Sequence, residues 1–210
     1  MNITNCRVYD LQESIVASGL PMLISYDADG FLNDAFSTLS DINSDGTNKH
    51  IGRMERLSNT PMGSGHGNAL SGITVSMNIT ATVKWWEQFQ RYHFKQIVSS
   101  MSTMHRLRKM VKEGTIQFHP STSETVINEF TKMANDDTVT DEQLAYSCPM
   151  GIMLTARVTT NYLQLRTMLT QRSTHKLLEW HQFCDYVLNN LPLADKLLKG
   201  AIHEPKTTES

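Results

Sequence analysis

The sequence has few cysteines and no long apolar run. Its three cysteines are far apart and form no CxxC or Cys/His spacing, which argues against a structural zinc site, so we expect no metal ligands. No stretch of eighteen apolar residues occurs, and the N-terminal MNITNCRVYDLQES has no apolar segment of signal-peptide length. We therefore expect a protein of the reducing cytoplasm that makes no membrane contact.

An excess of charge of one sign is also lacking. Lysine and arginine number 19 and aspartate and glutamate 21, for a formal net charge of -2, which is not typical of a protein that binds duplex DNA. Neither a GxGxxG motif nor a P-loop is present, so the common nucleotide-binding folds have no support. What is present is a 40% hydrophobic content over 210 residues, which is enough for one sizeable core.

The polarity pattern predicts one domain over residues 1–200 and a disordered polar tail over residues 201–210. The clearest strand spans residues 73–80, where apolar and polar side chains alternate. A helix is predicted from residue 81 at least to residue 97. The pattern is helical again over residues 160–191, after which Pro192 marks a stop.

Shorter segments complete the prediction. The segments PMLISYDADG and GTIQFHP are predicted as short strands, and SETVINEFTKMAND and DEQLAYSC as helices with acidic residues in their first turns. The segments DINSDGTNKHIGRM and NTPMGSGHGNALSG are predicted as polar loops. Because strands and helices do not alternate cleanly as βαβ units, the predicted class is α+β with a helical C-terminal part.

The segment QFQRYHFKQIVSSMSTMHRL, residues 88–107, concentrates basic and hydroxyl side chains. If it is one helix, a single stripe about 100° wide holds Arg91, Lys95, Ser102, His105 and Arg106. Such a stripe suits a phosphate or carboxylate, because guanidinium groups bind these oxyanions with paired hydrogen bonds. The alternative is a solvated basic face. The scarcity of acidic residues and the helix-poor SSMST count against it.

Two further segments carry candidate ligand contacts. Asn161, Arg172 and His175 share one predicted helical stripe with apolar residues between them. This stripe is either a ligand-facing surface or a core or subunit-interface helix whose arginine reaches water. His66 lies in the glycine-rich GSGHGNALSG, which either lets the backbone approach a ligand closely or is a flexible connection.

In this order and spacing, the three segments resemble the flavin-dependent thymidylate synthases, the ThyX family. That family has a loop histidine, an amphipathic strand, a helix ending in Arg-His-Arg, then a serine with a nearby arginine, and a late helix with Asn, Arg and His. Here HGNALSGITVSMNITATVKWWEQFQRYH matches without a gap, and FKQIVSSMSTMHRL matches with about three extra residues. CPMGIMLTARVTTNYLQLRTMLTQRSTHKLLEW resembles the late helix, one residue short between Arg172 and His175. The resemblance covers residues 66–183.

The resemblance implies an α/β fold with helices on a mixed sheet, assembled as a homotetramer. It implies that FAD, NADPH and methylene-tetrahydrofolate convert deoxyuridylate to thymidylate, with flavin and nucleotide bound where subunits meet. The residues implied along FAD are His66, Arg91, Asn161 and His175. The residues implied to hold the pyrimidine nucleotide are Arg91, Ser102 (with Ser99 and Ser100 as competing choices), Arg106 and Arg172.

The sequence also departs from the family pattern. Tyr92 and His93 stand where the family has His and Arg, and Ala145 and Leu163 stand where it has arginines. Each lost guanidinium removes a charged hydrogen bond of about 1.5–3 kcal/mol. His93 still offers an imidazole that can carry a proton near neutral pH, so Arg172 and His93 are the candidate catalytic residues.

These observations leave two functions open. One is a divergent flavin-dependent enzyme that adds a one-carbon unit to C5 of a pyrimidine deoxynucleotide, with Arg172 polarising the base carbonyl. The other is a ThyX-like oligomer that kept a nucleotide or flavin pocket but lost synthase activity, and that senses or sequesters nucleotides.

Overall fold

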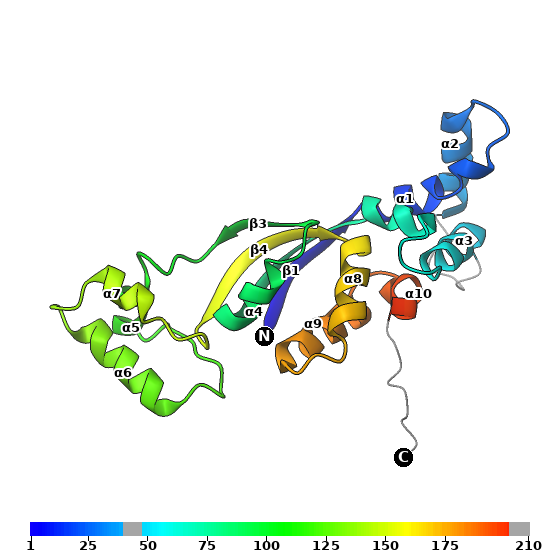
Figure 1. Ribbon diagram of the computed structural model, residues 1–210. Coiled ribbons are helices and arrows are strands. Elements are labelled where there is room, and N and C mark those ends of the chain that lie inside the picture. The colour runs from blue at the N-terminus through cyan, green and yellow to red at the C-terminus, as the bar shows by residue number, and fades with distance from the viewer. Residues whose placement is uncertain (40–47, 202–210) are drawn as a thin grey trace, which may run out of the picture. The chain divides into compact units, whose positions relative to one another are not determined.

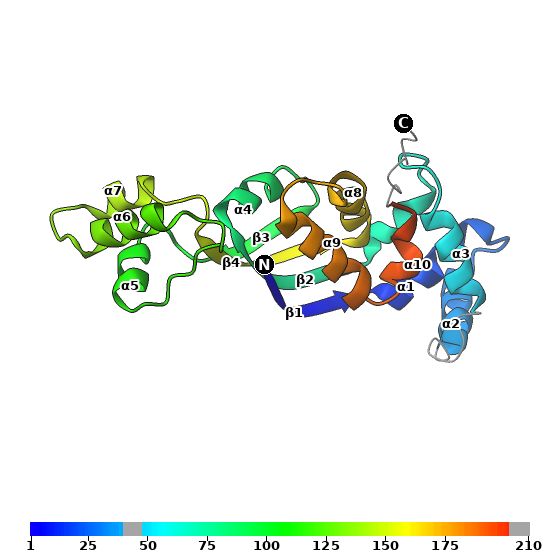
Figure 2. The ribbon, with the colours of Figure 1, turned by 90° about the horizontal axis from the view of Figure 1, so that it is seen from below.

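Four strands form one sheet in the computed structural model, which describes residues 1–39 and 48–201. They are β1 (Asn2–Tyr9), β2 (Thr74–Thr82), β3 (Lys95–Ser100) and β4 (Met153–Asn161). The sheet is antiparallel with the order β1-β2-β4-β3, and Figure 2 shows the strands side by side in this order. The predicted α+β class is confirmed. Of the predicted tail, residues 202–210 lie outside the described residues.

The chain divides into two compact units. Unit 1 holds residues 1–5 and 77–158, and unit 2 holds residues 6–76 and the chain from Thr159 onward. Strands β1, β2 and β4 therefore each contribute residues to both units. The predicted single domain is in this sense built from two units, which are described separately below.

Unit 1 contains four helices among its described residues: α4 (Val83–Phe89), α5 (Leu107–Lys112), α6 (Glu124–Asn135) and α7 (Asp141–Tyr146) (Figure 1). The last three pack around a buried apolar cluster made by Leu107, Phe130, Ala134, Leu144 and Ile152. On α4, Trp85 stacks on Phe89, and Trp86 donates its indole N–H to the Leu154 carbonyl of β4 at 3.0 Å. Burial of these aromatic rings fixes α4 against the sheet strands of its own unit.

Unit 2 consists mainly of helices, together with the parts of β1, β2 and β4 that belong to it. Its first part holds α1 (Leu11–Ala17), η1 (Leu20–Met22), α2 (Ala28–Leu39), α3 (Lys49–Ser58) and η2 (His66–Gly72). Its second part holds α8 (Tyr162–Arg172), α9 (Leu178–Asn190), α10 (Ala194–Leu197) and η3 (Lys199–Ala201). Tyr162 donates to the Pro192 carbonyl at 2.6 Å and so ties α8 to the chain after α9.

The structure corrects the predicted helix from residue 81 at least to residue 97, and with it the stripe that assumed one helix over residues 88–107. The helix ends at Phe89, residues 95–100 form the edge strand β3, and a new helix begins at Leu107. The predicted stripe from Arg91 to Arg106 is therefore wrong. Ile97 and Val98 are β-branched, and the hydroxyls after them favour extended or turn backbone, so pairing with β4 outweighs the helical pattern.

Other boundaries also differ from the prediction. PMLISYDADG contains no strand, because residues 20–22 are a 3₁₀ turn and α2 begins at Ala28. KHIGRM at the end of the predicted polar loop is the start of α3, whose N-terminal amides at His50 and Ile51 donate to the Asn48 side chain. The predicted strand near residues 73–80 is confirmed as β2 (Thr74–Thr82). The helices predicted over residues 123–136 and 141–148 are confirmed as the slightly shorter α6 and α7.

The late helical stretch is also interrupted. It consists of α8 and α9, separated by the turn over residues 173–177. Asn161 precedes α8 and His175 lies after it, so the predicted helical stripe that joined Asn161 to His175 is wrong at both ends. Within the described residues, no helix is both long enough and apolar enough to cross a bilayer.

Candidate functional site

The triplet Arg91-Tyr92-His93 forms a turn after α4. Arg91 and His93 are exposed, and no side-chain hydrogen bond joins either of them to the described residues. Tyr92 is only 8% exposed, and its ring packs edge-on against Phe89 with centroids 6.4 Å apart. The outer two side chains can therefore reach a ligand, whereas the middle one belongs to the core of unit 1.

Ser102 and Arg106 lie together in a hollow of unit 1 with a volume of about 550 Å³. The Ser102 hydroxyl accepts the backbone N–H of His105 at 3.3 Å, which shapes the turn before α5. Lys109 lines the same hollow, and its Nζ lies 3.5 Å from Glu113 Oε1. The hollow thus presents a hydroxyl and a guanidinium beside an ion pair. This set can bind a phosphate by hydrogen bonding and charge.

Arg172 and His175 meet at Trp180 in unit 2. The guanidinium carbon of Arg172 lies 4.9 Å from the centroid of the buried Trp180 ring, and the His175 ring stands edge-on at 6.5 Å. The backbone N–H of Leu177 donates to His175 Nδ1 at 3.0 Å, so the proton of the neutral ring is on Nε2. Burial, followed by the charges of Arg172 and His181, lowers the pKa of His175. The neutral His175 ring therefore offers its Nε2–H as a donor close to the Arg172 guanidinium.

Asn161 is the N-cap of α8. Its side-chain oxygen accepts the backbone N–H of Gln164 at 2.8 Å, and its amide nitrogen makes no hydrogen bond to the described residues. Asn161 and Arg172 stand at opposite ends of a helix of 11 residues, about 16 Å apart at the usual rise. Only an extended ligand can contact both ends of α8.

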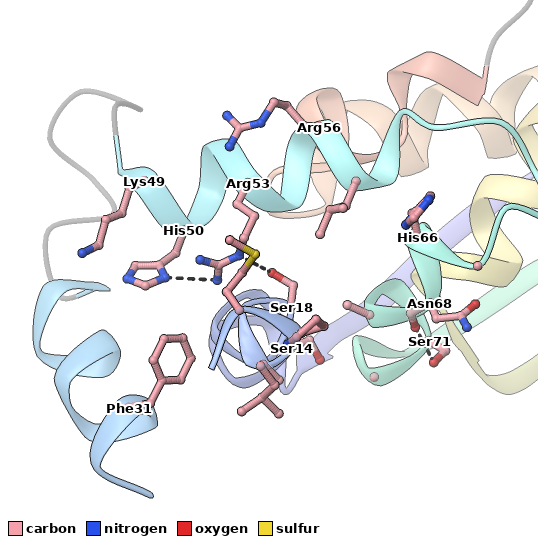
Figure 3. Close-up of a pocket in the computed structure, with 18 residues that line it drawn as sticks. Ser14, Ser18, Phe31, Lys49, His50, Arg53, Arg56, His66, Asn68 and Ser71 are labelled. Atoms are coloured by element: carbon pink, nitrogen blue, oxygen red, sulfur yellow. Dashed lines mark hydrogen bonds between the residues drawn. The ribbon is translucent and has the colours of Figure 1, made fainter. Parts of the chain in front are cut away.

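His66 opens η2 after a glycine-rich turn. Gly63 and Gly65 have positive φ angles of 86° and 80°, which glycine adopts without strain. The exposed His66 lines one end of an open cavity of about 1080 Å³, whose wall is made by residues in and around α1, η1, α2, α3 and η2 (Figure 3). The turn therefore brings a histidine to the wall of this cavity.

Three functional candidates of this region escaped the sequence analysis. His50 and Arg53 line the cavity from α3, in a segment that had been predicted as a loop. Asn48 as an N-cap and apolar side chains at residues 51, 54 and 57 are the sequence signals that could have revealed the helix. The third is Arg166, in the middle of α8. The sequence analysis did not single it out, because its neighbours on the helix are mostly apolar.

Arg166 is a buried cation that fastens the turn before His66. It is 4% exposed and donates to the Thr60 carbonyl, while its Nε has no partner among the described residues. Burial lowers its pKa. A Cβ at Gly67 would come within 3.0 Å of Arg166 Nη1, so glycine at this position permits the close approach. Arg166 positions the His66 turn rather than facing a ligand.

The structure thus brings predicted residues together in two places, and a third place holds His66 alone. Ser102 and Arg106 share the unit 1 hollow, Arg172 and His175 share Trp180, and His66 lies at the unit 2 cavity. Burial raises the pKa of Cys148 to about 11 and that of Cys184 to about 12, so both stay as thiols.

Comparison with solved structures accounts for this arrangement. Two crystal structures of ThyX from Helicobacter pylori, both with FAD and dUMP, superpose with TM-scores of 0.71 and 0.69. Each is 13% identical over 97% of this chain and 100% of the other. The fold is ThyX-like. A UMP/dUMP methylase, PolB from Streptomyces cacaoi with 5-Br dUMP, superposes with a TM-score of 0.59, at 11% identity over 95% of this chain and 94% of its own.

The likeness to ThyX lies in the fold and not in the sequence at large. No protein-family model and no curated protein sequence matches the chain. The ThyX-like fold nevertheless extends over almost the whole length of both chains, and so reaches beyond residues 66–183, to which the sequence resemblance was limited. Divergence at this level agrees with the altered Arg91-Tyr92-His93 triplet.

Proposed function

We propose that the protein is a divergent ThyX-like flavoenzyme of the cytoplasm that adds a one-carbon unit to C5 of a pyrimidine deoxynucleotide of the dUMP type. The observation that carries the proposal is the whole-length fold likeness to two ThyX structures solved with FAD and dUMP. A fold hosts many functions, so the side chains of the candidate site have to support the same chemistry.

The side chains fit an extended, phosphorylated, partly flat ligand such as FAD. Asn161 and His175 offer donors near opposite ends of α8. These donors are too far apart for a compact ligand to contact both. His66 adds an exposed imidazole, and Arg91 an exposed guanidinium for phosphate. When bound, FAD would supply the redox chemistry of the reaction. In the family reaction, NADPH and methylene-tetrahydrofolate are the reductant and the one-carbon donor.

We assign the nucleotide contacts to Ser102 and to three arginines, Arg91, Arg106 and Arg172. Ser102 and Arg106 would hold its phosphate in the unit 1 hollow, with Arg91 as a further phosphate contact. Arg172 would donate to a base carbonyl and stabilise the negative charge that develops on its oxygen as C5 becomes nucleophilic toward the one-carbon unit. Trp180 holds the Arg172 guanidinium in place, and such preorganisation makes a donor effective. The exposed His93 would carry a proton to or from the site.

A second candidate is a catalytically altered protein that binds nucleotide or flavin to sense or sequester it. The burial of Tyr92 against Phe89 favours this alternative, because no imidazole can reach a ligand from that position. Ala145 and Leu163 remove two further cations of the family pattern. Both candidates require the same ligand contacts and differ only in turnover.

The visible absorption spectrum of the purified protein separates these candidates most cheaply. A yellow protein with flavin bands supports the enzyme. A colourless protein that refuses added FAD, but is thermally stabilised by dUMP, supports the binding protein. Arg91→Ala and Arg172→Ala should each weaken dUMP binding about tenfold or more, as expected for a lost charged hydrogen bond. Arg7→Ala, at an exposed position of β1, serves as the control, and unchanged affinity in both test variants would refute the site.

Turnover is tested by growth of a thymidine auxotroph that carries the gene. We expect weak growth or none, because the substitutions at Tyr92, His93 and Ala145 remove family side chains. Restoring the family arginine at the exposed position with His93→Arg should increase growth if that position limits catalysis. Robust growth with the natural sequence would show that the family reaction does not need those side chains.

A further inference from the structure

Strand β3 is an open edge of the sheet in unit 1. It pairs with β4 on one side, and no strand of the described residues lies on its other side (Figure 2). Outside that pairing, residues 95–100 make no hydrogen bond from their backbone to another backbone group of the described chain. An uncovered edge carries a row of N–H and C=O groups that can pair with a strand of another chain.

The pairing with β4 determines which backbone groups of β3 point outward. The N–H of Met101, directly after β3, donates to the Thr155 carbonyl of β4 at 3.0 Å. In an antiparallel pair, every second residue directs both its N–H and its C=O toward the neighbouring strand. Residues 97, 99 and 101 therefore face β4. The residues that direct these groups away from β4 are Gln96, Val98 and Ser100.

The side chains along this edge are largely apolar and exposed. Phe94 is 69% exposed, Val98 59% and Met101 38%, and residues 88–107 contain no acidic side chain. The shortness of β3 and its single charge, Lys95, are features that discourage strand addition at an edge. They are compatible with a solvated edge, but they do not explain why large apolar side chains gather beside it in water.

The edge is complementary to a second copy of itself. Antiparallel pairing centred on Val98 places Val98 opposite Val98 and Gln96 opposite Ser100 of the other copy, so all three outward-facing residues form hydrogen-bonded pairs. About six backbone hydrogen bonds then surround a two-fold axis, as in any isologous interface. The charges are compatible as well, because the two Lys95 residues are six positions, or about 20 Å, apart along the paired strands.

The same pairing brings a cation of the second copy to the hollow that contains Ser102 and Arg106. Lys95 of the second copy lies opposite Met101, and directly opposite side chains share one face of a sheet and interact. Met101 lines that hollow. Lys95 makes no ion pair or hydrogen bond to the described residues of its own chain. Its ammonium group is therefore available to an oxyanion in the hollow of the other copy.

We propose that two copies of this chain pair through β3, antiparallel about Val98, and that Lys95 of each copy completes the hollow of Ser102 and Arg106 in the other. The two four-stranded sheets then join edge to edge. The pairing does not depend on the proposed function. The role of Lys95 rests on it, because the proposed function assigns the nucleotide phosphate to this hollow.

Cysteine cross-linking of the full-length protein tests the pairing. In Val98→Cys the two α-carbons would lie about 5.5 Å apart, within the range that a disulfide spans, so mild oxidation should give a covalent dimer. In Gln96→Cys the equivalent α-carbons would lie about 13 Å apart along the strands, so this variant and the natural protein should form none. No dimer from Val98→Cys, or equal cross-linking of both variants, would overturn the pairing.

Mixed samples determine the register. Position 96 of one copy lies opposite position 100 of the other, so Gln96→Cys and Ser100→Cys should form no dimer when each is oxidised alone. The two variants should form a disulfide-linked dimer when they are mixed before oxidation. Both positions are exposed, so the fold should be retained, which thermal melting checks. A mixture that forms no dimer would refute the centre at Val98.

Lys95→Gln tests what the second copy adds to the hollow. The affinity for dUMP should fall about fivefold, whereas Lys132→Gln, which removes the same charge from α6, should leave it unchanged. Lys95→Gln combined with Val98→Cys should still cross-link, because the backbone pairs remain. Unchanged dUMP affinity in Lys95→Gln would refute the role of Lys95.

Co-expression shows whether Lys95 acts on its own chain or on the other. When Lys95→Gln and Arg106→Gln copies pair, one of the two hollows has both cations, so the mixed protein should bind dUMP more tightly than either variant alone. Affinity no better than that of the separate variants would refute the contribution of the second copy. A protein that cross-links through Val98→Cys but binds no dUMP would support the pairing and refute both the nucleotide assignment and the role of Lys95.

Discussion

At the scale of single residues, the polar side chains buried in unit 2 are unusual. His50 and Arg166 are each almost fully buried, and each has a nitrogen without a partner among the described residues. Native proteins rarely leave such groups unpaired. Arg166 donates to the Thr60 carbonyl of its own unit, whereas the His50 ring accepts from Arg53 at Nδ1 and leaves its buried Nε2 without a partner among the described residues. The two residues therefore call for different experiments.

Arg166→Met tests whether the buried charge stabilises the fold. Methionine retains the apolar stem and removes an incompletely paired cation, so the free energy of unfolding should stay within about 1 kcal/mol of the natural protein or rise. Arg166→Ala leaves a cavity and should lower it by about 2 kcal/mol or more. Urea denaturation measures both. A large loss of stability in Arg166→Met would show that the charge itself holds the His66 turn.

The pH dependence of stability follows from His50 and His175. Burial is the largest cause that lowers both pKa values below the ordinary 6.5. As the pH falls below 6.5, the unfolded chain takes up protons before the folded chain does, so stability that is complete above 6.5 is progressively lost. Unfolding free energies measured between pH 7.5 and about 5 should show this decline. The decline should be shallower in His50→Gln and in His175→Gln; an unchanged slope in both variants would contradict it.

At the scale of elements, helix α8 organises the candidate site through its two ends. Its N-terminus is capped by Asn161, and its C-terminus places Arg172 over Trp180. The cap depends only on nearby residues, because the Asn161 side-chain oxygen accepts the backbone N–H of Gln164, three residues later in the chain. The position of Arg172 depends on α9, which supplies Trp180 from beyond the turn.

Substitutions at Asn161 separate capping from ligand binding. Asn161→Ala should lower the free energy of unfolding by about 1 kcal/mol, because the Gln164 amide loses its acceptor. Asn161→Asp should restore the cap and the stability. It should still weaken FAD binding, because it replaces the free amide donor with a negative charge. Thermal melts and flavin titration measure the two effects, and equal FAD affinity in Asn161→Asp and the natural protein would exclude a flavin contact.

At the scale of the whole molecule, we expect a homotetramer. The resemblance to ThyX implies this assembly, and unit 1 exposes large apolar side chains on and around the edge strand β3, namely Phe94, Val98, Met101 and Met104. Exposed apolar groups gathered in one region often mark a surface that another chain covers. Sedimentation should give a mass four times that of one chain. Val98→Lys, on β3 itself, should shift the protein to smaller species. Ser99→Lys, at the next exposed position, is the control.

The recognisable part of the candidate site was the part carried by short runs of sequence. The loop histidine, the β2 alternation and the α8 residues keep their order and spacing, so the resemblance to ThyX could be stated from residues 66–183. The cavity of unit 2 could not be predicted in this way. It is built from α1, η1, α2, α3 and η2, and the segments that form η1 and α3 were predicted as strand and loop.

By itself, the sequence determined the α+β class, the β2 strand, the helices α6 and α7, and the likeness to ThyX. Each of these depends on local periodicity or on residue order. Only the tertiary structure decided that residues 95–100 pair with β4 as a strand, that Tyr92 is buried while Arg91 and His93 stay exposed, and that Arg53 turns His50 into an N–H donor. Strand pairing and burial depend on neighbours distant in the chain, and local pattern carries no information about them.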